Sequence, residues 1–222
     1  MKKKTALVTG TSRGIGKSIK ESLLNEQIEV ISPSRNELDL SSFESINDFL
    51  TNLSTSIDIL VNNAGILKVG QHNELSSVDF HEILQVNVIA PFVMMSKLSH
   101  SMKENKYGRI VNVSSIWSQV SREGRSVYSA SKAAVDSLTR SFALELSPYS
   151  ILVNSIAPGY VNTELIKKNN SQTELDSIKK NIPLERFAEP SEIANLVTFL
   201  CSEKNSYITG QVIIMDGGYT CK

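Results

Sequence analysis

A glycine-rich turn near the start of the chain constrains its fold more than any other feature. The segment Thr9–Gly16 reads TGTSRGIG and lies between an apolar run, Thr5–Thr9, and an amphipathic run, Ile15–Asn25. Glycines at three of these positions allow a tight strand-to-helix turn and let the backbone approach a phosphate. Free N–H groups at the start of the helix also favour a bound anion. The turn therefore predicts a β-α unit that can hold a dinucleotide.

Strand-like and helix-like segments alternate along the rest of the chain. Apolar runs of strand length occupy residues 28–32, 57–61, 108–113, 151–156 and 211–215. This alternation predicts an α/β fold: a Rossmann-like, doubly wound parallel sheet of about seven strands, with helices on both faces in three αβα layers. The chain has 222 residues and no repeat or low-complexity tract, so residues 1–222 are expected to form a single NAD(P)-binding domain.

The charge balance and the cysteine spacing argue against several kinds of partner. The 23 basic and 23 acidic residues cancel, whereas a nucleic-acid binder usually carries a basic excess. No apolar run approaches the roughly eighteen residues of a membrane span. Cys201 and Cys221 lack the spacing of a metal or redox site, and His72, His81 and His100 are scattered. We expect a cytoplasmic protein that uses no metal, nucleic acid or membrane.

Tyr128 and Lys132, in the sequence YSASK, supply the expected chemistry. Their spacing places both side chains on one face of a helix. A tyrosine hydroxyl has a reference pKa of about 10, and a nearby lysine cation lowers that pKa. A serine can hydrogen-bond the substrate oxygen as its charge develops, and Ser114 and Ser115 compete for that role. These residues predict hydride transfer between a nicotinamide cofactor and a carbonyl or secondary alcohol, with Tyr128 as proton donor or acceptor.

The residues after the second expected strand bear on the choice of nucleotide. NAD-specific enzymes usually carry an acid there that accepts the ribose hydroxyls, but this chain reads Pro33-Ser34-Arg35. Arg35 and Arg13, in the glycine turn, can together grip a 2′-phosphate. The alternative is that both arginines are solvated surface residues. The pattern favours NADP(H) and leaves NAD(H) open.

Seven motifs, in order and over essentially the whole chain, resemble those of the short-chain dehydrogenase/reductase family. Besides the glycine turn and the YxxxK pair, they are NNAG at 62–65, Asn87 in QVNVIAPF, the strand and serines at 108–115, PGYVNT at 158–163 and DGG at 216–218. Within the family, the chain looks most like β-ketoacyl-carrier-protein reductases. Each short motif is weak alone, but their shared order makes a chance match implausible.

The resemblance implies four catalytic residues: Asn87, Ser115, Tyr128 and Lys132. The family's spacing to the tyrosine selects Ser115 over Ser114. Asn87 is expected to hold a helix kink and a water that relays protons towards Lys132, which also binds the nicotinamide ribose. The cofactor-binding residues expected from the motifs and the resemblance together are Gly10, Thr11, Ser12, Arg13, Gly14, Ile15, Gly16, Arg35, Asp39, Leu40, Asn63, Ala64, Gly65, Tyr128, Lys132, Pro158, Gly159, Val161 and Thr163.

One segment departs from the family pattern. Most members have a full helix between the second and third strands, but here Arg35–Asp39 joins them almost directly. We therefore expect one edge of the sheet to be less covered and the adenine pocket to be more open.

Two segments are expected to set substrate specificity. A lysine-rich stretch, Lys167–Lys180, is the candidate for a mobile lid. The other segment, Ile116–Val127, contains Trp117, Gln119, Arg122 and Arg125. Both segments favour a polar or anionic substrate over an apolar one. The alternative is that the lysines form a solvated surface and do not contact the substrate.

The function expected is reduction of a 3-ketoacyl or related polar keto substrate, either a small molecule or carrier-linked. A reductase or dehydrogenase of a sugar or nucleotide-sugar pathway is the alternative, and a non-catalytic NADP(H)-binding sensor or scaffold is less favoured. Lys106 can supply one basic residue for a carrier protein, but the matching position near Tyr149 is not basic. The resemblance also implies a homo-oligomer, a dimer or more specifically a tetramer, built through the two long helices and the last strand.

Overall fold

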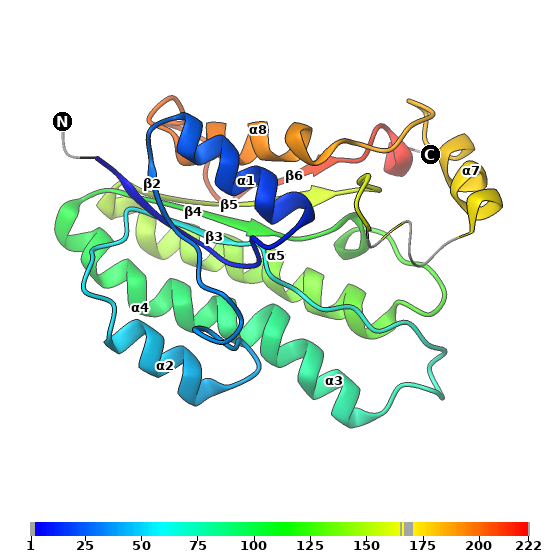
Figure 1. Ribbon diagram of the computed structural model, residues 1–222, viewed down its shortest axis with the longest axis horizontal. Helices are drawn as coiled ribbons and strands as arrows, with labels where there is room; N and C mark the ends of the chain where they lie inside the picture. The colour runs from blue at the N-terminus through cyan, green and yellow to red at the C-terminus, as the bar shows by residue number, and fades with distance from the viewer. Residues whose placement is uncertain (1–2, 165, 167–170, 222) are drawn as a thin grey trace.

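A parallel β-sheet lies between two layers of helices in the computed structural model, which describes residues 3–164, 166 and 171–221 (Figure 1). The strands run in the order β2-β1-β3-β4-β5-β6, so the chain starts near one edge and crosses to the other. Every pair of neighbouring strands is parallel. The strands are β1 (Thr5–Val8), β2 (Glu29–Ile31), β3 (Ile59–Asn62), β4 (Gly108–Val113), β5 (Ile151–Pro158) and β6 (Val212–Met215). The expected doubly wound α/β architecture is confirmed.

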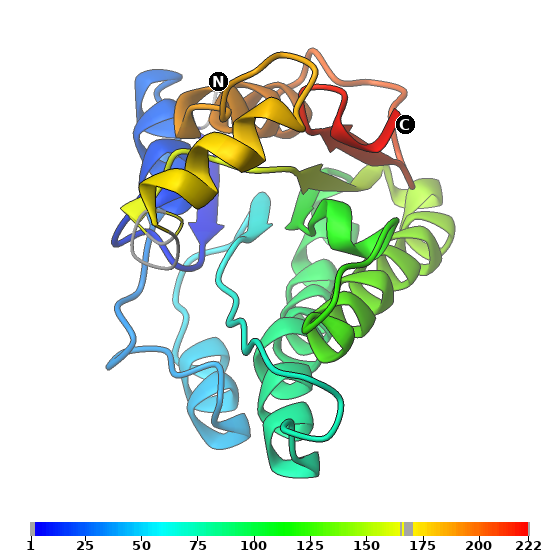
Figure 2. The same ribbon diagram turned by 90° about the vertical axis from the view of Figure 1, so that its right-hand side faces the viewer.

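The two faces of the sheet bury alternate residues of the same strands. Leu7, Leu60 and Ile110 belong to one apolar cluster, which α2 (Phe43–Thr51), α4 (Ala90–Asn105) and α5 (Ser126–Leu146) cover. The neighbouring residues Ala6, Ile59 and Val111 belong to the other cluster, under α1 (Gly14–Asn25) and α8 (Pro190–Cys201). Figure 2 shows the two helical layers on either side of the sheet. Strands buried on both faces explain why they read as continuous apolar runs.

The sheet has six strands in the described residues, where about seven were expected. No strand lies between β2 and α2, where every residue is described: the chain there makes turns closed by bonds from the Glu37 and Leu38 N–H groups to the Ser34 carbonyl (3.1 and 3.0 Å). It then enters α2 directly, where Ser42 accepts a hydrogen bond from the Ser45 N–H. The short connection therefore lacks both the usual helix and the strand after it, and β2 becomes the edge of the sheet.

One of the long helices is a continuous helical stretch, Ser77–Asn105, with an irregular middle. It consists of α3 (Ser77–Leu84), a π-helical turn η1 (Gln85–Ile89) and α4. By length and composition alone this stretch could cross a membrane. Its apolar residues Ala90, Met94 and Met95 are instead fully buried in the core against the sheet.

The carboxyl ends of all six strands meet at one edge of the sheet because the strands are parallel. The turns after these strands therefore converge there, on the right-hand side of Figure 1, together with α7 (Gln172–Lys180). Of the expected lid, residues 167–170 lie outside the described part, and the remainder forms α7, which packs through Leu175. In open α/β sheets, ligands bind at this edge.

Candidate active site

The glycine turn leaves no room for a side chain at its last glycine, Gly16. A Cβ added at Gly16 would lie 2.1 Å from the Gly10 carbonyl oxygen and 2.3 Å from the Asn63 amide nitrogen. Gly10 and Gly14 also adopt φ angles of 70° and 57°, which glycine tolerates best. The Asn63 Nδ2 group donates to the carbonyls of Thr9 and Gly10 at 2.9 and 3.0 Å. This turn therefore has the bare backbone surface that a pyrophosphate requires.

The loop after β3 lies between this turn and α5, the helix that carries Lys132. Thr9 Oγ1 accepts hydrogen bonds from the N–H groups of Asn63 and Ala64, at 3.1 and 3.0 Å. A Cβ at Gly65 would lie 3.2 Å from Asn87 Oδ1 and 3.5 Å from Lys132 Nζ. The absence of a side chain at Gly65 thus leaves room between the glycine turn and Lys132.

A cavity of about 490 Å³ opens beside the glycine turn. Its lining includes many of the residues predicted to bind the cofactor: Gly10, Thr11, Ser12, Arg35, Asp39, Leu40, Ala64 and Gly65. Lys20 and Glu37, which the sequence analysis missed, also line it, whereas its described lining does not include Arg13. Lys20 lies one helical turn beyond Gly16, a spacing that could have indicated its position.

Both signs of charge meet at the end of this cavity that Arg35, Glu37 and Asp39 line. The exposed Arg35 guanidinium lies 3.8 Å from the Asp39 carboxylate. Glu37 accepts a hydrogen bond from the Ser34 N–H at 2.7 Å. Lys20, on α1, makes no ion pair with any described residue, although the exposed pair Lys17–Glu21 is on the same helix.

Lys132 is almost completely buried beneath the active-site edge. Its Nζ donates to the Val113 carbonyl at 2.7 Å and lies 5.6 Å from the centroid of the Tyr128 ring. Burial lowers the pKa of Lys132 to about 8, and the charge of Asp136, one helical turn later, opposes this decrease. The side chain is therefore an ammonium close to its titration point.

Tyr128 lies in the first turn of α5, where burial raises the pKa of its phenol. A hydrogen bond with the Ser115 side chain and the charge of Arg125 both act to lower this pKa. The phenol therefore keeps its proton at neutral pH, next to a hydroxyl that can share a bound oxygen with it.

The two candidate serines have different surroundings. The Ser114 hydroxyl is turned to the backbone, donating to the Lys132 carbonyl at 3.4 Å. Ser115 instead faces Tyr128 and accepts a bond from the Trp117 N–H at 3.3 Å. The geometry favours Ser115 as the hydroxyl available to a substrate.

Asn87 lies in the π-helical turn η1 and holds two segments together. Its side-chain amide accepts from the Ile66 N–H and donates to the Ile66 carbonyl, both at 2.9 Å, and donates to Ser131 Oγ at 3.1 Å. Ser131 in turn donates to the Tyr128 carbonyl. Asn87 thus fixes the loop after β3 against the first turn of α5.

The residues expected at the nicotinamide end follow β5. The Gly159 N–H donates to the Met215 carbonyl at 2.9 Å, and a Cβ at Gly159 would lie 2.8 Å from the Asp216 Cα. Asp216 accepts bonds from the N–H groups of Gly218 and Thr220, which explains the DGG motif as a structural clamp. Thr163 would meet a Cβ at Gly14, 3.3 Å away, so this segment reaches back to the glycine turn.

A buried carboxylate behind Lys132 was not expected from the sequence. Asp136 Oδ1 accepts a hydrogen bond from Ser155 Oγ at 2.9 Å, and its Oδ2 accepts one from Gln119 Nε2 at 3.1 Å. The only hint in the sequence was that Asp136 lies one helical turn after Lys132.

Among the described residues, no group of three or more His, Cys, Asp or Glu side chains is placed to hold a metal ion.

Comparison with known proteins gives consistent matches. A family model described as enoyl-(acyl carrier protein) reductase matches residues 17–220. The 3-oxoacyl-[acyl-carrier-protein] reductase FabG of Aquifex aeolicus is 38% identical, over 97% of this chain and 96% of that protein. The uncharacterized oxidoreductase YmfI of Bacillus subtilis is 35% identical, over 98% and 99% of the two chains.

Solved structures are similar over the same extent. A mutant 4-hydroxyisoleucine dehydrogenase complexed with NADH and succinate superposes with a TM-score of 0.94, at 32% identity over 99% of each chain. A protein from Beutenbergia cavernae, provisionally described as an NAD(P)-dependent gluconate 5-dehydrogenase and bound to NADP, gives a TM-score of 0.91. It is 30% identical, over 99% of this chain and 97% of that one.

Proposed function

This chain belongs to the short-chain dehydrogenase/reductase family, and on that premise we propose that it is an NADP(H)-dependent reductase of a 3-ketoacyl or related polar keto substrate. As a member it is an oxidoreductase that acts on carbon–oxygen bonds of the CH-OH type. The observation that carries the proposal is the meeting of Ser115, Tyr128 and Lys132 beside a glycine cradle that fits a dinucleotide.

The catalytic residues have separate roles in this proposal. A nicotinamide, held by the residues predicted to bind it, would supply or accept the hydride. Tyr128 donates its proton to the carbonyl oxygen, and its raised pKa suits a donor in the reductive direction. Ser115 hydrogen-bonds that oxygen as charge develops on it. Lys132 stabilises the tyrosinate that remains after proton transfer. Asn87 and Lys132 together border the space beside Gly65, through which a proton can return to Tyr128.

The cofactor would follow the strand ends. The glycine turn, Gly10–Gly16, would hold the pyrophosphate, and Asn63, Ala64 and Gly65 would pass the adenosine ribose. Asp39 and Leu40 would border the adenine. Val161 and Thr163, with Pro158 and Gly159 before them, would meet the nicotinamide amide.

The preference for NADP(H) depends on cations at the adenine end of the cavity. Arg35 and the unpaired Lys20 both line it and support a 2′-phosphate, whereas Glu37 favours free ribose hydroxyls. Arg13 is exposed and outside the described lining, so Lys20 takes its place in the proposal.

Fluorescence titration with NADPH and NADH, side by side, tests this preference. We expect NADPH to bind more tightly, with Lys20→Ala and Arg35→Ala each weakening NADPH by about tenfold or more and leaving NADH almost unchanged. Lys17→Ala, on the exposed face of the same helix, is the matched control. Tighter NADH binding by the wild type would favour an NAD-linked dehydrogenase instead, and binding of neither nucleotide would contradict the oxidoreductase proposal.

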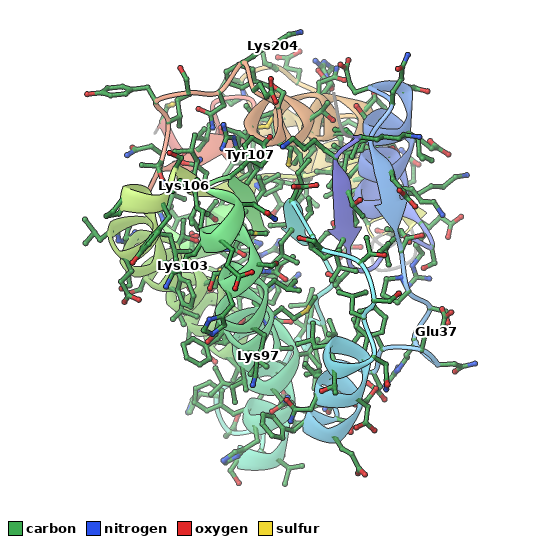
Figure 3. All side chains as sticks on the ribbon, turned by 90° about the vertical axis from the view of Figure 1, so that its left-hand side faces the viewer. Glu37, Lys97, Lys103, Lys106, Tyr107 and Lys204 are labelled. Carbon is green, nitrogen blue, oxygen red and sulfur yellow. The ribbon has the colours of Figure 1, made fainter. Side chains whose placement is uncertain are left out.

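Relatives named as 3-oxoacyl-carrier-protein reductases support a ketoacyl substrate. Lys106, however, precedes the amino end of β4, while Ser115 follows its carboxyl end. Lys97, Lys103, Lys106 and Lys204 lie on the side of the molecule that Figure 3 faces, away from the carboxyl ends of the strands. Lys106 is therefore not beside the active site of its own chain, and this lysine face gives carrier binding no support there.

A sugar dehydrogenase is the second candidate. The gluconate 5-dehydrogenase description of one structural neighbour favours it, as does the polar loop before Tyr128. A non-catalytic sensor is distinguished by binding NADPH without oxidising it in the presence of ketones. We place the enzyme in the cytosol, where the buried Cys201 and the exposed Cys221 would remain free thiols.

A further inference from the structure

Two arginines stand immediately before the catalytic tyrosine. The loop that carries them follows η2 (Ile116–Ser118) and ends at the start of α5. Arg125 is the residue directly before α5, three positions ahead of Tyr128. Arg122 donates from Nη1 to the Tyr160 hydroxyl at 3.4 Å. Their side chains thus border the place where a substrate must approach the phenol.

Neither arginine forms an ion pair within the described part of the chain. The arginine ion pairs there involve Arg35 and Arg186 only. The Glu174 carboxylate of α7 accepts its hydrogen bonds from the hydroxyl and N–H groups of Ser171, and these bonds lower its pKa. The charge of Arg122 acts on the same carboxylate and also helps to lower its pKa. Arg125 is half-buried, and both burial and repulsion from Arg122 lower its pKa. The half-buried Arg125 and the exposed Arg122 repel each other and have no ion-pair partner among the described residues, so a bound anion would stabilise both.

The start of α5 adds to this positive charge. The helix has no side-chain cap and no acidic residue in its first turn. Its first N–H groups therefore lack the partners that a capped helix provides, and they favour an anion. The positive potential at the helix start adds to the charge of the two arginines. The arginines themselves provide the bidentate donors that suit a carboxylate.

Aromatic rings form a wall next to the same place. Trp117, Tyr160 and Tyr219 contact one another edge to face, with ring centroids 5.5–6.3 Å apart. Trp117 begins this wall directly beside Ser115, to which its N–H donates. The site therefore combines a proton donor, a short apolar wall and two cations.

We propose that Arg122 and Arg125 bind a carboxylate of the substrate, and that the natural substrate is a small keto acid or hydroxy acid whose carbon chain lies along the Trp117–Tyr160–Tyr219 wall. This inference rests on the proposed reductase activity and narrows its substrate class. Binding of the carboxylate by the loop before α5 holds the reacting carbonyl against Tyr128 and Ser115. A second anion source, the phosphate of a carrier-linked or phosphorylated substrate, has the same chemistry and is separated by the test.

Steady-state kinetics on matched substrates tests the site. The substrates are a series of short keto acids, the methyl ester of each, and the matching carrier-linked ketoacyl thioester and keto-sugar phosphate. The variants are Arg122→Gln and Arg125→Gln, and Arg140→Gln on the exposed face of α5 is the matched control. We expect the wild type to prefer a free acid over its ester by about 10²-fold in kcat/KM. Arg125→Gln should remove most of this preference by lowering kcat/KM for the acid while leaving kcat/KM for the ester unchanged. NADPH affinity should be unchanged in all three variants.

Calorimetric titration with malonate, which has no ketone to reduce, separates this inference from the reductase proposal. Malonate binding by the wild type that is lost in Arg125→Gln, but kept in Arg140→Gln, supports the carboxylate site even if no ketone is reduced. Equal use of acid and ester, or a preference for the thioester or sugar phosphate, would overturn it. Failure to reduce any ketone despite malonate binding would count against the reductase proposal alone.

Discussion

At the scale of single residues, the site separates two adjacent serines by their partners. Ser114 donates to the backbone of α5, while Ser115 contacts Tyr128. We predict that Ser115→Ala lowers kcat by about 10²-fold or more, because a donor to the developing alkoxide is lost. Ser114→Ala is the matched control and should lose much less. The measurement is kcat of both variants with the same ketone at saturating NADPH. A larger loss in Ser114→Ala than in Ser115→Ala would contradict the assignment of Ser115 to the substrate oxygen.

The buried pair Lys132 and Asp136 makes a prediction about pH. The pKa of Lys132 is about 8, so the ammonium loses its proton, and its support for the tyrosinate, as the pH rises through that value. Reduction should therefore decline on the alkaline side. Asp136 is the charged group that raises this pKa, so Asp136→Asn should move the alkaline limb to lower pH.

The pH profile of kcat for wild type and Asp136→Asn measures this shift. Asp48→Asn, on the partly covered helix α2, is a control that should leave the profile unchanged. A profile for Asp136→Asn that falls in height without moving would mean that Asp136 acts only by holding Gln119 and Ser155 in place.

At the scale of elements, the first βα turn and the loop after β3 act as one unit through Asn63. We predict that Gly16→Ala abolishes cofactor binding and destabilises the fold, since its Cβ would overlap the Gly10 carbonyl. Gly70→Ala is the control, because its Cβ would meet only the ends of flexible side chains, Leu75 and Glu74. Titration with NADPH and thermal unfolding measure both effects. Normal NADPH binding by Gly16→Ala would contradict the packing described.

Most elements could be predicted from the sequence because their signals are local. Strands buried on both faces give apolar runs, and the glycine turn has a steric need that the chain itself displays. The absence of a strand between β2 and α2 could not be predicted. Leu38 and Leu40 are buried and apolar there, as strand residues would be, but the connection forms turns. Apolar content alone does not distinguish these two states.

The site was predicted where motifs carry it and missed where only the tertiary structure brings groups together. Tyr128 and Lys132 follow from their helical spacing, and Ser115 was chosen over Ser114 through the family resemblance. Lys20 comes near Arg35 only because α1 packs beside β2, and Asp136 meets Gln119 from a separate loop. These contacts join separate elements, so helical spacing along one segment hints at the position of Lys20 or Asp136 but does not give its partner.

At the scale of the whole molecule, exposed apolar residues on the long helices bear on assembly. Phe92 on α4 is 46% exposed and Leu144 on α5 is 80% exposed. We propose that these helices join copies of the chain into a dimer or tetramer, as expected from the family resemblance. Sedimentation should show an oligomer that Leu144→Glu dissociates, whereas Leu24→Glu, at a half-exposed position of α1, should leave it intact. A wild-type monomer at micromolar concentration would contradict this.

The most direct test of the account is Tyr128→Phe, studied for binding and turnover in the same preparation. Removing only the hydroxyl takes away the proton donor and leaves the ring and Lys132 in place. We predict that NADPH binds Tyr128→Phe as it binds the wild type, while the rate of ketone-dependent NADPH oxidation falls by about 10²- to 10⁴-fold or to zero. A variant that binds NADPH and turns over near the wild-type rate would contradict the assignment of Tyr128 as the proton donor.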